Sequence, residues 1–368
     1  MAKEKSAKYI ANVNESDETV NETFANLLAQ LPNGGKLYKY RALKTFHEDE
    51  LEEQYLWFSS AANLNDNKDC SFNVNLLEEK ERLIKFFEKR ENYKRIAINM
   101  IYNEMHVAND WLTKEMIAKL FSGKSIDTNE SYRREIRTFC LRCGLDNQQS
   151  KSLLSKIILY TADEQRKENV RNMLDELSQK IEKIRKSMLV CSLTTSYKKD
   201  SMWAYYCNNK GICIEYDFSK IESMDLKKIF QKTKKVKYGR KPKFSFIDIL
   251  KAELFGEEDE KSQAENVVFR QLLTKDKSWS TEEEWRTILA GNNNLLGVKA
   301  YINFISAVYI DYSVLRLKKT RKILKLANEN GWQIYVRYFD TFVAEYKYDT
   351  IEKARKALKR MKMTINRG

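Results

Sequence analysis

Two short segments near the start of the chain predict β-strands, and in the first of them apolar and polar positions alternate. The first segment is KLYKYRAL at 36–43, and the second is YLWFSSAANLND at 55–66, where the strand runs into a loop. Between them, 45–54 is acidic near its start and predicts a helix. The polar residues 1–35 predict an N-terminal arm with a short helix near Val20–Leu31.

The pattern changes between Leu76 and Met188, where apolar residues recur every three or four positions. This spacing predicts a block of about four to six helices, with breaks near Gly123 and Gly144. The last part of the block, 164–187, is charged on most faces and predicts a long, partly exposed helix.

Strand patterns return after Met188. The chain then predicts strands at 189–196 and 211–218 around a short helix at 200–209, helices at 246–275, strands at 285–289, 300–312 and 332–339, and basic helices at 313–331 and 350–362. This order predicts an α+β fold in which a mixed or antiparallel sheet is split by a large helical insertion. The predicted domains are an arm at 1–35, a core at 36–75 and 189–350, a helical insertion at 76–188 and a basic C-terminal helix at 351–368.

Composition supports a helix-rich protein. The chain has 368 residues with only 2 prolines and 11 glycines, which is few for a sandwich built on tight turns. Its net charge of +14 fits an anionic partner such as nucleic acid, and it equally fits a lysine-rich, well-solvated surface. We find neither a membrane-length apolar run nor a signal-peptide pattern, so we expect a cytoplasmic protein with no membrane partner.

Cysteine and histidine usage narrows the chemistry. Six cysteines in a chain of this size do not form a disulfide framework, and Cys140-x-x-Cys143 has no second pair at zinc spacing. We therefore expect reduced cysteines and no metal site. His47 and His106 are the two histidines, which argues against a Ser-His-Asp triad.

The first candidate site is the stretch SWSTEEEWRTIL at 278–289. If the strand pattern extends back through the acids, Glu282 and Glu284 lie on one side and Glu283 on the other. Two acids at the edge of a sheet could polarise a hydroxyl and stabilise a cationic transition state. A solvated acidic loop or a helix N-terminus is the alternative.

The second candidate site is the segment 190–218, in which a strand, a hydroxyl-rich turn, an aromatic helix and a second strand follow one another. Its Ser and Thr hydroxyls could bond a ribose, and Trp203 and Tyr206 could stack on a flat ring. The alternative is that these aromatic side chains cover the sheet as part of the core.

Four strings, in the order LYKYRAL, WFSSAANLND, SMWAYYCNNKGICIEYD and EEEWRTI, resemble a bacterial family known as domain of unknown function 2971. The resemblance spans about 36–290 and is most specific at the Met-Trp and Glu-Trp-Arg elements. The chain departs from the family at Lys39, where Arg is usual, and at Asn67, where Pro is usual. This resemblance implies no function.

The order YKYRA, SLTTS and EEE also resembles the ADP-ribosyltransferase superfamily of Arg-Ser-Glu type. That resemblance implies an ADP-ribosyltransferase-like core in which Arg41, or Lys39 in its place, grips a phosphate of NAD. It implies that Glu284 bonds the ribose 2′-hydroxyl and stabilises the oxocarbenium ion, while Glu282 faces the acceptor. The cofactor-binding residues expected on this basis are Arg41, Tyr40, Ser192, Thr194, Ser196, Trp203 and Tyr206.

The chain departs from this second pattern as well, because Thr194 stands where the first Ser is expected and Ser192 comes two residues early. The implied function is NAD-dependent ADP-ribosyl transfer, or NAD hydrolysis, by a toxin or anti-phage defence effector with a protein or nucleic-acid acceptor. One alternative is a nucleic-acid-binding protein or a nuclease, for which Asp66, Asp69 and Glu215 are scattered candidate acids. The other alternative is a non-catalytic interaction module.

Overall fold

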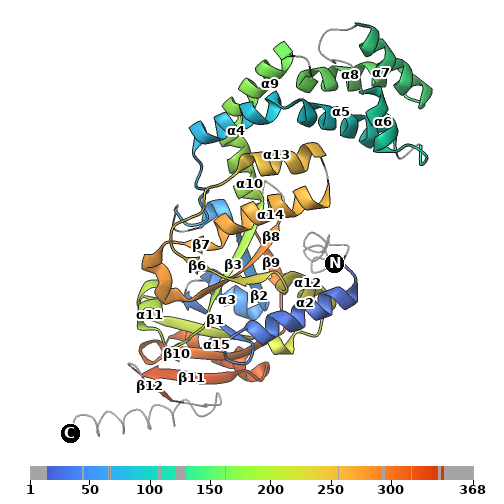
Figure 1. Ribbon diagram of the computed structural model, residues 1–368. Helices are drawn as coiled ribbons and strands as arrows, with labels where there is room; N and C mark the ends of the chain where they lie inside the picture. The colour runs from blue at the N-terminus through green and yellow to red at the C-terminus, as the bar shows by residue number, and fades with distance from the viewer. Residues whose placement is uncertain are drawn as a thin grey trace, which may run out of the picture. The chain divides into compact units, whose positions relative to one another are not determined.

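The computed structural model describes residues 15–43, 45–64, 66, 68–106, 109–121, 130–161, 163–255, 257–291, 295–315, 317–338 and 341–343. The first 14 residues of the predicted arm, Asn67 and the predicted basic helix at 351–368 lie outside the described residues. The described chain forms two compact units (Figure 1). Unit 1 takes its described residues from Met1–Cys70, Arg185–Arg240 and Leu273–Gly368, and unit 2 from Ser71–Ile184 and Lys241–Leu272.

Unit 1 is built on a mostly antiparallel sheet. Its strands are β1 (Lys36–Ala42), β2 (Tyr55–Ser60), β3 (Met188–Thr194), β4 (Gly211–Asp217), β5 (Thr233–Lys235), β6 (Lys237–Tyr238), β7 (Thr274–Lys275), β8 (Glu284–Ala290), β9 (Gly297–Tyr301), β10 (Ile305–Asp311), β11 (Gln333–Tyr338) and β12 (Thr341–Val343). Within the described residues, ten of them form one sheet in the order β12-β11-β10-β4-β1-β3-β2-β9, and β8 pairs with both β3 and β5. Among the described strands of this sheet, only β10 and β11 pair in parallel, while β6 and β7 form a separate parallel pair. An open, mixed α+β fold is confirmed.

Helices cover both faces of the unit 1 sheet. They are α2 (Asp17–Gln30), α3 (Thr45–Glu52), α11 (Asp200–Cys207), α12 (Met224–Phe230) and α15 (Lys318–Glu329), with short 3-10 helices η1 (Ala61–Asn63), η2 (Phe218–Lys220), η3 (Lys277–Glu282) and η4 (Tyr312–Val314). The main core packs apolar side chains of α2, α3, α12 and α15 against one face of the sheet. A smaller cluster packs α11 against the other face of β1 and β4. Because α15 contributes its apolar side to the core, its lysines lie on the remaining surface.

Several element boundaries follow from local chemistry. Helix α2 begins three residues before the predicted Val20 because the Ser16 hydroxyl accepts a hydrogen bond from Thr19 N at 3.2 Å. Helix α11 ends where Asn208 adopts a left-handed conformation with φ 49°. Strand β4 starts at Gly211, and glycine is required at this position because a Cβ there would lie 2.3 Å from the carbonyl oxygen of Arg41.

Unit 2 is helical. It contains α4 (Leu76–Glu88), α5 (Arg90–Met105), α6 (Lys114–Leu120), α7 (Glu130–Arg142), α8 (Asn147–Thr161), α9 (Asp163–Asp175), most of α10 (Leu177–Ser187), α13 (Phe246–Phe255) and α14 (Glu258–Leu272). Helices α5 to α8 share an apolar core that includes Cys140 and Cys143. These cysteines are free, as expected, and burial raises the pKa of Cys140 to about 11.

The units divide the chain differently from the predicted domains. Residues 241–272, assigned to the core from the sequence, belong with the helices of unit 2, where α13 packs on α14, α5 and α4. Within the described residues, no helix is long and apolar enough to cross a bilayer.

Candidate functional site

Strands β3 and β8 pair along their whole length, which brings the two candidate segments together. Thr194 lies opposite Glu284, and Ser192 lies opposite Arg286. Leu193 belongs to the main core, so the side chains of Ser192 and Thr194 lie on the opposite face, together with Glu284. The predicted neighbourhood of the hydroxyl strand and the acidic stretch is therefore present.

A buried group of charged side chains, here called the charge cluster, lies beside this pairing. Lys275 Nζ lies 2.6 Å from Glu282 Oε2 and 3.1 Å from Glu284 Oε2. Arg286 Nε lies 2.7 Å from Glu284 Oε1, and Arg286 Nη2 lies 2.6 Å from Asp69 Oδ2. Three carboxylates against two cations leave this buried group with one excess negative charge.

The ion pairs control the ionisation of Glu284. Burial alone would raise the pKa of this carboxyl group, but Arg286 and then Lys275 outweigh burial and lower the pKa to about 2. For Lys275, burial acts to lower the pKa, whereas Glu284 and Asp69 raise it above its usual value. Both side chains are therefore charged at neutral pH.

We expect the free energy of unfolding of unit 1 to fall as the pH is lowered from about 4.5 to about 2. The pKa of Glu284 in the folded protein is below its usual value of 4.5, so its stabilisation is complete above pH 4.5 and is lost as the pH falls toward 2. The loss should be on the order of 3 kcal/mol. Urea unfolding across this range measures it. With Glu284→Gln the pH dependence should be shallower by about one proton, and an unchanged slope would contradict this assignment.

The remaining predicted site residues near the acids form hydrogen bonds with them, although Tyr206 is 39% exposed. Tyr206 donates its hydroxyl to Glu282 Oε1 at 2.6 Å. Thr194 Oγ1 donates to the backbone carbonyl of Glu282, and the Ser192 hydroxyl bonds Glu284. The structure thus brings these five residues together, but the carboxylates of both predicted acids are held inside the charge cluster.

Two of the aromatic residues predicted for the site, Tyr40 and Trp203, belong to the smaller core cluster that packs α11 against β1 and β4. Trp203 is fully buried, its ring lies 5.3 Å from that of Tyr40, and its Nε1 donates to the carbonyl of Tyr197 at 2.8 Å. Tyr40 donates its hydroxyl to the carbonyl of Ser196 at 2.9 Å. For Trp203, the alternative of core packing is therefore what the structure shows.

Arg41 does not join Glu284. It forms a bidentate ion pair with Glu50, at 2.6 Å from Nε to Oε2 and 2.7 Å from Nη2 to Oε1. Lys39, on the same face of β1, donates to Cys191 Sγ and to the carbonyl of Ser192. Since side chains alternate along a strand, Arg41 lies on the face of the sheet opposite Tyr40.

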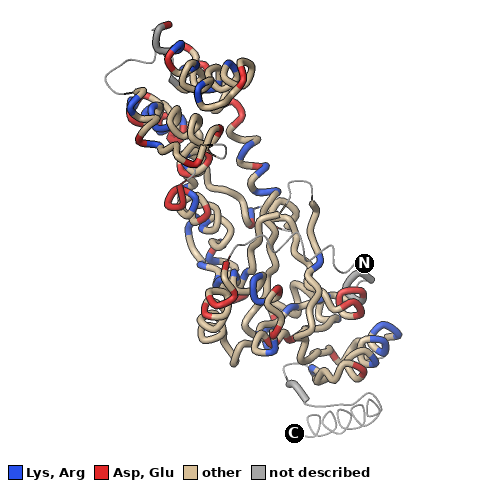
Figure 2. The backbone as a smooth tube through the Cα atoms, turned by 90° about the vertical axis from the view of Figure 1, so that its right-hand side faces the viewer, with Lys and Arg blue, Asp and Glu red and all other residues tan. Residues whose placement is uncertain are grey.

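The candidate nuclease acids are also separated. Asp69 lies in the charge cluster, whereas Glu215 accepts hydrogen bonds from Tyr309 and Ser306 and pairs with Lys36 at 3.0 Å. Asp66 accepts a backbone hydrogen bond from Lys68 in a turn. Among the described residues, no group of three or more His, Cys, Asp and Glu side chains is arranged to hold a metal ion. Figure 2 shows Lys and Arg interspersed with Asp and Glu along the helices.

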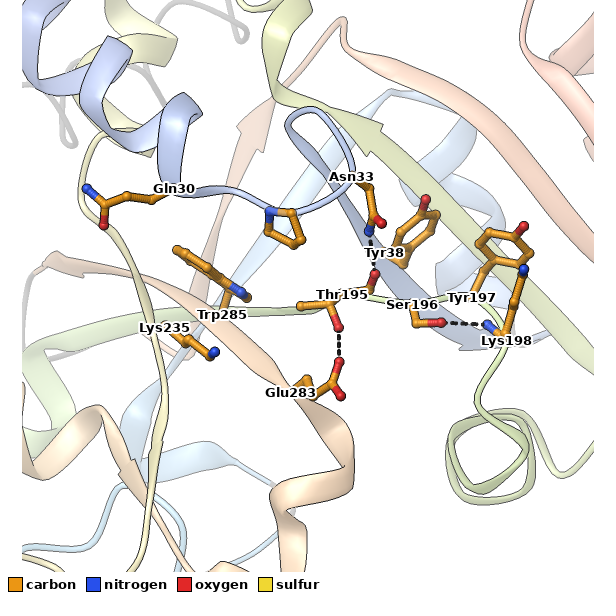
Figure 3. Close-up of a pocket in the computed structure, with 11 residues that line it drawn as sticks. Gln30, Asn33, Tyr38, Thr195, Ser196, Tyr197, Lys198, Lys235, Glu283 and Trp285 are labelled. Atoms are coloured by element: carbon orange, nitrogen blue, oxygen red, sulfur yellow. Dashed lines mark hydrogen bonds between the residues drawn. The ribbon is translucent and has the colours of Figure 1, made fainter.

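A pocket of about 660 Å³, here called the strand-end pocket, opens where β3 ends and β8 begins (Figure 3). It combines aromatic rings, amides, hydroxyls, cations and one carboxylate. Its lining residues are Gln30, Pro32, Asn33, Tyr38, Thr195, Ser196, Tyr197, Lys198, Lys235, Glu283 and Trp285. Of the residues predicted from the sequence, only Ser196 lines it.

Glu283 is the member of the acidic stretch that reaches this pocket. It has a left-handed backbone with φ 46°, which is uncommon for a residue other than glycine. Thr195 Oγ1 donates to Glu283 Oε2, and Lys199 Nζ lies 2.9 Å from the same oxygen. The Thr195 hydroxyl, followed by Lys199, lowers the pKa of Glu283 below its usual value. Backbone strain of this kind is concentrated at functional sites.

Most residues of this pocket are not among the site residues predicted from the sequence. The strand pattern predicts that Glu283 lies on the side opposite Glu282 and Glu284, and this was a signal that it faces a different environment. Thr195 and Trp285 lie within the motifs SLTTS and EEEWRTI. Lys235 and Asn33 carried no pattern that could have identified them. Asn33 enters the pocket because it has a left-handed φ of 55° and donates its side-chain amide to the carbonyl of Thr195 at 2.7 Å.

Comparison with protein families gave a match over part of the chain. Residues 202–287 match the model of a family described as Protein of unknown function (DUF2971). This segment runs from α11 into β8, so it includes Tyr206, Lys275, the acidic stretch and Arg286. The resemblance to that family is supported over this segment, whereas the resemblance to ADP-ribosyltransferases receives no support. Comparisons with curated proteins and with solved structures gave no match.

Proposed function

We propose that unit 1 binds NAD in the strand-end pocket and cleaves its nicotinamide–ribose bond, with Glu283 as the catalytic carboxylate. The ADP-ribosyl group passes to an acceptor or to water. The observation that carries this proposal is the position of Glu283, which presents a carboxylate to a pocket at the end of the hydroxyl-bearing strand.

Cleavage of the nicotinamide–ribose bond is favoured by a fixed negative charge beside the ribose. When the bond between ribose C1′ and the nicotinamide nitrogen breaks, its electron pair leaves with the nitrogen and C1′ becomes part of an oxocarbenium cation. A carboxylate beside this cation lowers the energy of the transition state. An oxygen of the acceptor or of water then bonds to C1′ and releases its proton to solvent.

The hydrogen bonds of Glu283 suit this role. Thr195 and Lys199 hold the carboxylate in place, and its lowered pKa keeps it ionised at neutral pH. Glu282 and Glu284 are each bonded to cations inside the charge cluster, so we assign them to fixing the turn that carries Glu283. This differs from the roles implied by resemblance, which gave catalysis to Glu284.

The pocket walls offer further complementarity to a dinucleotide. Its volume falls within the range of about 300–1,000 Å³ that is usual for small-molecule sites. Tyr197, which is partly exposed and lies 5.4 Å from the buried ring of Tyr38, offers aromatic surface to a base, and Lys198 and Lys235 carry positive charge.

The biological role that we propose is that of a toxin or an anti-phage effector, the setting implied by the ADP-ribosyltransferase resemblance. The net charge of +14 favours a nucleic-acid acceptor over an uncharged one.

We expect the purified protein to release nicotinamide from NAD, either alone or in the presence of an acceptor. Chromatography of reactions with NAD alone and with added cell extract, RNA or DNA measures the product and identifies the acceptor class. Release that requires RNA or DNA would point to nucleic acid as the acceptor. No release in any reaction, together with no rise in melting temperature on addition of NAD, would contradict the proposed function.

A further inference from the structure

The strand-end pocket contains a buried donor without a partner. Trp285 is 6% exposed, and its Nε1 has no hydrogen-bond partner among the described residues. A buried indole N–H normally finds an acceptor. Trp285 lines the pocket, and Figure 3 shows its ring nitrogen directed into the space between Lys235 and Thr195. The pocket is therefore where its missing acceptor can bind.

A cation stands next to this donor because of strand register. Lys235 on β5 lies directly opposite Trp285 on β8. Residues directly opposite on paired strands present their side chains on the same face. The next pair on that face confirms the geometry, since the hydroxyls of Thr233 and Thr287 lie 2.7 Å apart. Among the described residues, the Lys235 ammonium group forms no hydrogen bond or ion pair, and it interacts electrostatically with Glu283.

We propose that Trp285 Nε1 and Lys235 Nζ form a phosphate subsite that binds a nucleotide in the strand-end pocket. A neutral N–H and an ammonium group can each bond one oxygen of the same phosphate, and the ammonium group balances its charge. The carboxylate of Glu283 is bound by Thr195 and Lys199, and Lys235 also contributes to lowering its pKa. Lys198, which also lines the pocket, adds positive charge at its other side.

This inference deepens the proposed function and rests on it for the identity of the dinucleotide. It supplies the phosphate contact that the ADP-ribosyltransferase resemblance implies for Arg41, whose guanidinium group is bonded to Glu50. The Trp285 N–H donor carries no net charge, so this donor can be removed without changing the net charge of the pocket.

The test is calorimetric titration of the full chain with ADP and with adenosine. Trp285→Phe keeps an aromatic ring and removes the N–H, and Lys235→Met keeps the length and removes the charge. Lys234→Met is the matched control, because Lys234 lies opposite Arg286 and on the other face of β5. Circular dichroism and melting temperatures establish that each variant is folded.

We expect each of the two subsite variants to weaken ADP binding by about tenfold or more, with adenosine binding and the Lys234→Met variant unchanged. Wild-type affinity for ADP in Trp285→Phe would overturn the subsite, as would an equal loss of ADP and adenosine binding. Binding of a short RNA without binding of ADP would overturn the nucleotide as ligand. Because ADP has no nicotinamide bond, the subsite is supported if ADP binds as expected even when NAD stays intact, and only the proposed function then fails.

Discussion

Replacing Lys275 with Met should destabilise unit 1 by about 3–5 kcal/mol, because it leaves buried carboxylates without their shared cation. Lys275 contacts both Glu282 and Glu284 and lies 3.5 Å from Asp69, and its side chain is only 8% exposed. With Arg286 alone remaining, the excess negative charge of the charge cluster would rise by one unit.

Urea unfolding followed by tryptophan fluorescence measures this change, since five of the six tryptophans lie in unit 1. Lys277→Met, which removes an exposed lysine two residues later, is the matched control and should change stability by less than about 0.5 kcal/mol. Adding Glu282→Gln to Lys275→Met should recover part of the loss, because it removes one of the stranded charges. A loss below about 1 kcal/mol would contradict the view that the cluster is a tightly coupled buried network.

Replacing Glu283 with Gln should lower the rate of nicotinamide release by about 10²–10³-fold, with little change in melting temperature. Gln keeps the size of the side chain and its capacity to accept from Thr195, but it removes the charge that stabilises the oxocarbenium cation. The Glu283 side chain is 55% exposed, and the amide oxygen of Gln can still lie beside Lys199 Nζ, whose side chain is 17% exposed. Steady-state kinetics should show the loss mainly in kcat, since the charge is needed in the transition state.

The equivalent changes at Glu282 and Glu284 should behave differently. Each of these carboxylates is bonded to a buried cation, so Gln at either position should lower stability before any effect on rate is considered. The contrast between the three adjacent acids separates a catalytic role from a structural one.

The element types could be predicted from the sequence because they depend on local spacing. The alternation in 36–43 predicted β1, the strand pattern at 211–218 predicted β4, and the three-to-four spacing between Leu76 and Met188 predicted helices of unit 2. Short elements such as β5 and β12 carry too few residues for a periodic signal. The grouping of 241–272 with unit 2 also had no signal, because a helical pattern does not say which core it joins.

The geometry of the acidic stretch shows where local rules stop. The expectation that Glu282 and Glu284 share a side agrees with their common contact to Lys275, although the strand begins only at Glu284. The alternation of side chains along a strand does not say which of the two sides faces the protein interior. That depended on the cations Lys275 and Arg286, which bond the outer two acids on the inner side and leave Glu283 facing the pocket. Both cations also pair with Asp69, more than 200 residues earlier in the sequence.

Strand geometry also explains why Arg41 and Tyr40 do not serve one site. Adjacent residues in a strand point to opposite faces, so the two could not both contact the same ligand from β1. Arg41 is matched instead by Glu50, which α3 brings to the other face of the sheet.

The most direct measurement is nicotinamide release from NAD by the wild-type protein and the Glu283→Gln variant, assayed side by side with the acceptor found to be required. Glu222→Gln, at an exposed acid elsewhere in unit 1, serves as the control. We expect release by the wild type and the control, and a loss of about 10²–10³-fold in the Glu283 variant. Equal release by all three proteins would contradict the assignment of catalysis to Glu283.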